Sequence, residues 1–164
     1  MDQKRNSRQL YLTIAASFGL AMTLMLLSVA DVIYYFWPDW VLPTLIAWGM
    51  REPYRVGPFI GVAVGVLSDV LLTQTFGVLG LSLALIAFLV NQSAAQINAM
   101  SIWQQCGVIA VLTLLFKFVS GWLFGLVEGF SFTLSFWYST LGNVIAWPFL
   151  AIALQSVHGR LRRR

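Results

Sequence analysis

The sequence predicts an all-α integral membrane protein, a compact bundle of about six transmembrane helices, on the basis of two observations. Hydrophobic residues make up 59% of the chain and charged residues only 10%, with a mean hydropathy of +0.81, whereas a soluble domain carries about 25% charged residues. Apolar segments separated by short polar turns account for nearly all of the 164 residues. We therefore expect one transmembrane domain over residues 1–164 and no extramembrane domain.

The first three predicted spans are residues 10–30, 40–50 and 58–73. The first is an apolar run of about 20 residues, longer than the ~7–15-residue core of a cleaved signal peptide, which indicates a retained anchor. The segment after it, from Asp31 to Asp39, combines two acids with aromatic residues and Pro38, as is typical of an interfacial turn. The second predicted span is too short for a full crossing, so it must borrow its flanks, tilt or remain a partial span.

The last three predicted spans are residues 78–96, 103–127 and 136–157. A turn with two glycines, Gly77 and Gly80, separates the third span from the fourth. Asn143 and Pro148 lie in the last span. An even number of crossings places both termini on the same side of the membrane.

The basic residues predict which side that is. Nine of the ten fall on the side of the termini, namely Lys4, Arg5, Arg8, Arg51, Arg55, Arg160, Arg162, Arg163 and Arg164. The positive-inside rule then predicts cytoplasmic N and C termini. This distribution explains the net charge of +4 as a topology signal, so we expect membrane lipid and not nucleic acid as the surroundings of the basic runs.

Catalytic and metal-binding motifs are absent from the sequence. Cys106 is the only cysteine, which excludes an intrachain disulfide and a cysteine metal cluster. The sequence contains no HExxH motif and no Ser-His-Asp group. We therefore expect no enzymatic activity, cofactor or metal.

Asp69 is the one charge between Gly57 and Val90. In a helix it shares a stripe with Gly57, Gly61 and Gly65, because these residues recur every fourth position. Small residues let helices approach closely in a membrane. We therefore expect Asp69 to face protein and not lipid.

Lys117 begins a second stripe, with Gly121 and Gly125, on the fifth predicted span. The two spans could pack in parallel and pair Lys117 with Asp69, although their predicted depths differ by about 9 Å at ~1.5 Å per residue. Two interpretations stay open: a bundle-locking ion pair, or a functional charge in an ion path, ligand site or partner contact. Asn143 is expected to form an interhelical hydrogen bond.

The sequence resembles the rod shape-determining MreD family over most of its length. The matching features are Trp37 to Leu42 (WPDWVL), Pro53 with Arg55, Gly65-x-x-x-Asp69 with Gly77, Trp103-Gln104-Gln105, and Asn143 with Trp147-Pro148. The resemblance implies a non-enzymatic subunit of the bacterial inner-membrane machinery for cell elongation and peptidoglycan synthesis. Its partners would be MreC, the MreB filament, the glycosyltransferase RodA and the transpeptidase partner of RodA. Lys117 is outside this pattern.

The resemblance also implies a fold similar to the substrate-binding subunits of energy-coupling-factor transporters. An alternative function follows from that fold: a vitamin-binding subunit in which Asp69, Lys117 and Asn143 line a pocket near the outer face. The predicted outer turns are very short, which offers little chain for a lid over a ligand.

Overall fold

The computed structural model describes residues 2–27, 37–73, 75–129 and 135–162. These residues form six helices: α1 (Asp2–Leu26), α3 (Val41–Arg51), α4 (Pro58–Leu71), α5 (Val78–Ala99), α6 (Ile102–Glu128) and α7 (Ser135–Arg162). No strand occurs in these four ranges. Three helices contain stretches long and apolar enough to cross a membrane by themselves, Arg8–Leu26, Val78–Ala99 and Ile102–Val127. The predicted all-α membrane fold is confirmed.

The helix bounds differ from the predicted spans mainly at the ends. Helix α1 begins at Asp2, because the basic segment before the apolar run is helical too. The predicted end of this span, at residue 30, lies outside the described residues. Helix α4 stops at Leu71, two residues before the predicted end at Thr73, where φ is positive, at 51°. Helix α7 contains Pro148 and extends to Arg162.

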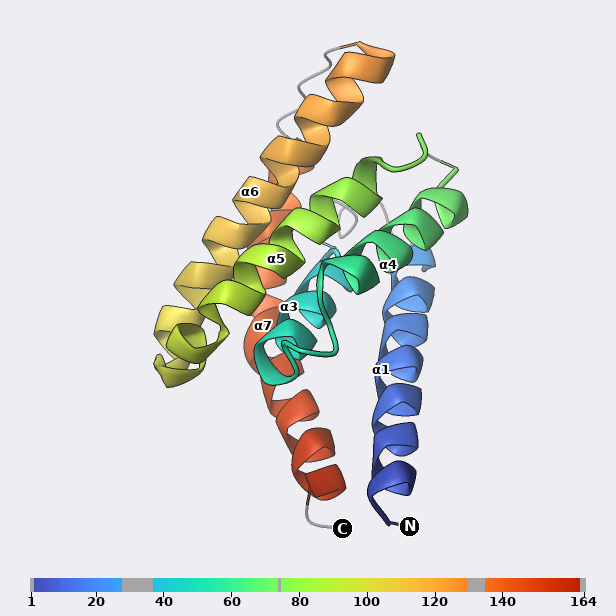
Figure 1. The fold of residues 1–164 in the computed structure, drawn as a ribbon. Helices are drawn as coiled ribbons and strands as arrows, with labels where there is room; N and C mark the ends of the chain where they lie inside the picture. Colours follow the sequence, from blue (N-terminus) through green and yellow to red (C-terminus); the bar gives the residue numbers. More distant parts are fainter. Residues whose placement is uncertain (1, 28–36, 74, 130–134, 163–164) are drawn as a thin grey trace.

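Helix α3 lies at the centre of the bundle (Figure 1). It packs against α1, α5 and α7, and every residue from Val41 to Met50 is buried. A helix that is apolar on all sides needs such surroundings. Its 11 residues span about 16 Å, about half of the ~30 Å hydrocarbon core. The sequence left open whether this segment borrows its flanks, tilts or remains a partial span. The structure shows a partial span, surrounded by longer helices.

Helices α4 and α5 form a tight antiparallel hairpin. A Cβ added to Gly61 would lie 2.8 Å from the carbonyl oxygen of Leu83, and one added to Gly65 would lie 2.4 Å from the Cα of Gly80. Real Cβ atoms do not come this close to backbone atoms. Glycine at these two positions is what lets the two helix backbones touch.

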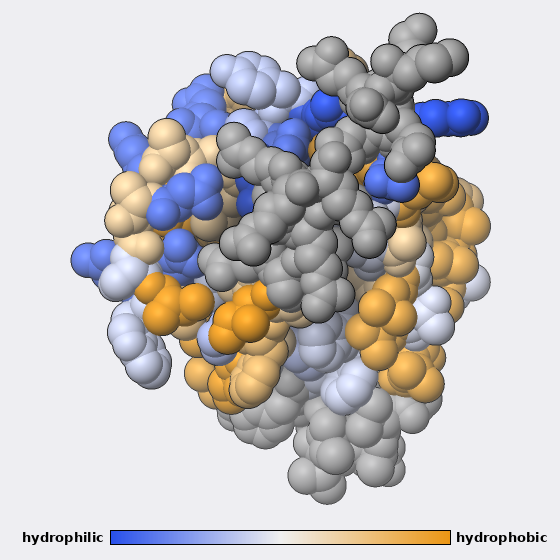
Figure 2. Space-filling model, turned by 90° about the horizontal axis from the view of Figure 1, so that it is seen from below, coloured by the Kyte–Doolittle hydropathy of each residue, from blue (hydrophilic) through white to orange (hydrophobic). Residues whose placement is uncertain are grey.

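Helix α1 begins and α7 ends at the same end of the molecule (Figure 1). Polar side chains tie down the turns at this end: Asn98 Nδ2 donates to the carbonyl of Met50 (2.7 Å), and Asn91 Nδ2 to that of Pro53 (2.9 Å). Arg51 donates to the carbonyls of Ala47 (3.0 Å) and Ala151 (2.9 Å), which joins the end of α3 to α7. Hydrophilic residues gather on one part of this end, next to apolar surface (Figure 2).

Candidate functional site

The main polar feature of the bundle interior is a charged cluster at the start of α3. We call Asp39, Lys117, Ser139 and Asn143 the Asp39 cluster. Lys117 Nζ lies 2.8 Å from Asp39 Oδ2, and the two side chains are only 7% and 21% exposed. Asp39 lies two residues before α3, where the N-terminal end of the helix dipole favours a negative charge. The ion pair thus joins α6 to the entrance of the central helix.

Helix α7 completes the cluster. Asn143, which is fully buried, accepts a hydrogen bond at Oδ1 from the backbone N–H of Asp39 (2.8 Å). Its Nδ2 lies 3.5 Å from Asp39 Oδ2, and the Ser139 hydroxyl donates to the same oxygen at 3.3 Å. Helices α6 and α7 therefore both donate to one oxygen, Oδ2, of the carboxylate that precedes α3. The expected interhelical bond of Asn143 is present, and its partner is Asp39.

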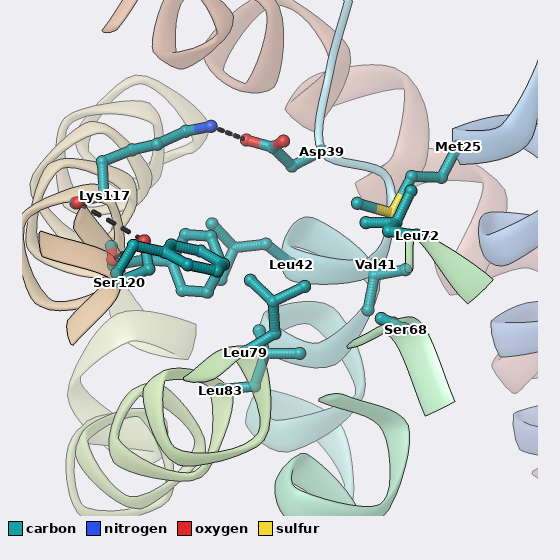
Figure 3. Close-up of a pocket in the computed structure, with 12 residues that line it drawn as sticks. Met25, Asp39, Val41, Leu42, Ser68, Leu72, Leu79, Leu83, Lys117 and Ser120 are labelled. Atoms are coloured by element: carbon teal, nitrogen blue, oxygen red, sulfur yellow. Dashed lines mark hydrogen bonds and ion pairs between the residues drawn. The ribbon is translucent and has the colours of Figure 1, made fainter. Parts of the chain in front are cut away.

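A cavity of about 100 Å³ lies beside the Asp39 cluster. The ends of α1 and α4 and the starts of α3 and α5 surround it, together with α6, so it lies at the end of the bundle opposite the termini. Figure 3 shows the Lys117–Asp39 pair on one side and Met25 with Leu72 on another. The lining is otherwise apolar apart from two hydroxyls, Ser68 and Ser120, and each of these already donates to a backbone carbonyl of its own helix.

Asp69 lies apart from this cluster and has different partners. It is fully buried, and its two oxygens accept the backbone N–H groups of Gly77 (2.8 Å) and Leu79 (3.2 Å). These are orphan donors at the N-terminus of α5, where a carboxylate also meets the positive end of the helix dipole. Asp69 is therefore a cap for α5 supplied by the neighbouring helix. This corrects the expected partnership: the ion pair of Lys117 is with Asp39, and Asp69 binds backbone.

The glycine stripes also differ from the expected arrangement. Gly57, Gly61 and Gly65 lie along α5, and α4 packs against this antiparallel neighbour and not against a parallel α6. On α6, Gly125 is buried and Gly121 partly buried, in a helix that packs against α7 and α5. The expected contact between the glycine faces of α4 and α6 is therefore wrong: the glycine face of α4 packs against α5.

Asp39 is the member of the Asp39 cluster that the sequence pattern did not single out as a site residue. Its neighbours Trp37, Pro38 and Trp40 indicated an interfacial turn, and the acid was read as part of that turn. A signal was present, because an acid directly before a short, wholly apolar helix is in position to meet the helix dipole. The sequence did not indicate that Lys117 would come to it.

The fold and the cluster define a polytopic membrane protein whose buried charges join its helices to one another. The comparison with known families is more particular. The family model described as rod shape-determining protein MreD matches residues 6–157. The chain therefore belongs to the MreD family, which acts in rod shape determination. No solved structure matches the chain.

Proposed function

We propose that the protein is a non-enzymatic scaffold subunit of the cell-elongation machinery in the bacterial inner membrane, where it partners MreC. MreB, RodA and its transpeptidase partner would belong to the same complex. The family match over residues 6–157 is the single observation on which the proposal depends. A scaffold needs a rigid shape that holds partners in place, and it needs no reacting group.

The internal contacts support a rigid scaffold. The carboxylates of Asp39 and Asp69 are both used within the bundle, one for an ion pair and the other for capping α5. Charges at membrane depth usually mark ion or substrate paths. Here each has a defined structural task, which favours the bundle-locking interpretation over an ion path.

A vitamin-binding subunit is the competing function, and the cavity beside the Asp39 cluster is the observation in its favour. Its volume of about 100 Å³ is well below the ~300–1,000 Å³ of pockets that enclose drug-sized ligands. A vitamin would fit only after the surrounding helices move apart. The cavity size therefore favours the scaffold.

Depletion of the protein in a rod-shaped host tests the proposal. Depleted cells should become spherical, and re-expression should restore rods. Co-purification from mild detergent should recover MreC. Cells that keep their shape but fail to take up a vitamin, or a chain that co-purifies with a transport ATPase, would instead establish the transporter function.

The proposed orientation has cytoplasmic termini. It is supported by the position of Arg8, Arg51 and Arg55 at the end of the bundle where α1 begins. Reporter fusions at each terminus should be active only in the cytoplasm. A terminal fusion active only in the periplasm would reject the orientation.

A further inference from the structure

Two arginines lie near one tyrosine where α1 meets the turn between α3 and α4. The guanidinium of Arg55 lies over the ring of Tyr11, 5.1 Å from its centroid, within the ~6 Å of a cation–π contact. Arg8 is exposed and precedes Tyr11 by three residues, so the two side chains are neighbours on the same face of α1. Arginines from two separate segments of the chain therefore come close to Tyr11. We call Arg8, Tyr11 and Arg55 the arginine pair site.

The depth of this site is that of lipid headgroups. The apolar stretch of α1 begins at Arg8, so the hydrocarbon boundary crosses the helix here. Tyr11 is 55% exposed, and Tyr54, next to Arg55, is fully exposed. Tyrosine is enriched at the level of the headgroups, where its ring and hydroxyl meet different surroundings.

The guanidinium groups of Arg8 and Arg55 have N–H donors that form no hydrogen bond with the residues that the structure describes. By contrast, the guanidinium of Arg51, four residues before Arg55, donates hydrogen bonds to two backbone carbonyls and joins α3 to α7. Arg55 uses only Nε, at 3.4 Å from Glu52 Oε2, and neither its Nη groups nor Arg8 has a hydrogen-bond partner in the described parts of the chain. Planar guanidinium forks match the oxygens of a phosphate group. Two arginines opposed by one glutamate leave the site positive, and Lys4 and Arg5 precede it by one turn in the sequence.

From this geometry we infer that the arginine pair site binds the phosphate of an anionic phospholipid headgroup. A lipid is favoured over an acidic protein segment because the site lies at headgroup depth and the adjoining chain exposes aromatic side chains: Tyr54, next to Arg55, is fully exposed, and Phe59, four residues after Arg55, is 90% exposed. The bound lipid would connect α1 to the α3–α4 turn, two parts that touch here through Arg55 and Tyr11.

Native mass spectrometry of the purified full-length chain tests the inference. The protein is titrated in detergent with phosphatidylglycerol or with phosphatidylcholine, which carries no net charge. Phosphatidylglycerol should bind more tightly, and Arg8→Gln or Arg55→Gln should each weaken it by about fivefold. Tyr11→Leu should also weaken it, because Arg55 loses the ring that positions it. Arg160→Gln, which removes an equal charge near the end of α7, at the same end of the molecule as the start of α1, is the matched control and should leave binding unchanged.

Three outcomes would overturn the inference. Equal affinity for the two lipids, both of which carry a phosphate, would show that the site does not recognise the net negative charge of the headgroup. An equal loss for Arg160→Gln and Arg8→Gln would reduce the effect to general surface charge. Displacement of the lipid by an acidic peptide, or by inorganic phosphate alone, would assign the arginines to those ligands. Thermal unfolding of each variant without lipid is the folding control; Arg8 and Tyr11 are exposed and Arg55 is partly exposed, so their replacement should leave the fold intact.

Discussion

The ion pair between Asp39 and Lys117 should be measurable by a double-mutant cycle with Asp39→Asn and Lys117→Met. Both replacements keep approximately the size of the side chain, so the cycle changes charge more than packing. The 2.8 Å contact joins α6 to the entrance of the buried helix α3. Removal of either partner should therefore loosen the centre of the bundle.

The expected magnitudes follow from what each change leaves behind. Breaking a buried pair costs about 3–5 kcal/mol in soluble proteins, whereas polar contacts between membrane helices average about 0.6 kcal/mol. After Lys117→Met, Asp39 keeps Ser139 and Asn143 as partners and is 21% exposed, so we expect a loss of about 1–2 kcal/mol. After Asp39→Asn, a 7% exposed ammonium loses its carboxylate, and we expect about 2–3 kcal/mol.

Equilibrium unfolding in detergent measures these losses. The double variant should lose no more than the worse single variant, which corresponds to a coupling of at least about 1–2 kcal/mol. Ser120→Ala is the control: this buried hydroxyl on α6 bonds only within its own helix, to the carbonyls of Phe116 and Lys117, and should contribute little. Losses that add to within about 0.5 kcal/mol would refute the reasoning, because they would show that the two charges do not stabilise each other.

Two further predictions concern the α4–α5 hairpin. Asp69→Ala should lower the free energy of unfolding by about 2–3 kcal/mol, because two backbone N–H groups at the start of α5 lose their acceptor. Hydrogen exchange of the Leu79 amide should become faster. Unchanged exchange together with lost capture of MreC would instead make Asp69 a binding residue. Gly65→Ala should prevent the tight packing of α4 on α5, since the added Cβ would lie 2.4 Å from the Cα of Gly80. Gly107→Ala on α6 is the control: the added Cβ meets nothing within 4 Å, so this change should be neutral or slightly stabilising. Thermal unfolding in detergent compares the two variants, and equal stability would contradict the close approach of the two helices.

Composition and local pattern were enough to predict the all-α membrane fold, because hydrocarbon leaves the backbone no other way to satisfy its hydrogen bonds than helices or closed barrels. Most helix ends were also predicted to within a few residues, since glycines, prolines and polar runs interrupt the apolar segments locally. The shortness of the segment at residues 40–50 already indicated an unusual helix. That it would be the buried centre depended on the helices around it.

The sequence by itself determined which residues must avoid lipid: Asp69, Lys117 and Asn143 are all buried, at 0%, 6% and 0% exposure. Only the tertiary structure decided their partners. Spacing along a helix fixes the face and the approximate depth of a side chain, but the neighbour on that face depends on how all the helices pack together. Asp69 met the start of α5 because α4 and α5 form a hairpin, and Lys117 met Asp39 because α3 is short enough to begin inside the bundle at the depth of the ammonium.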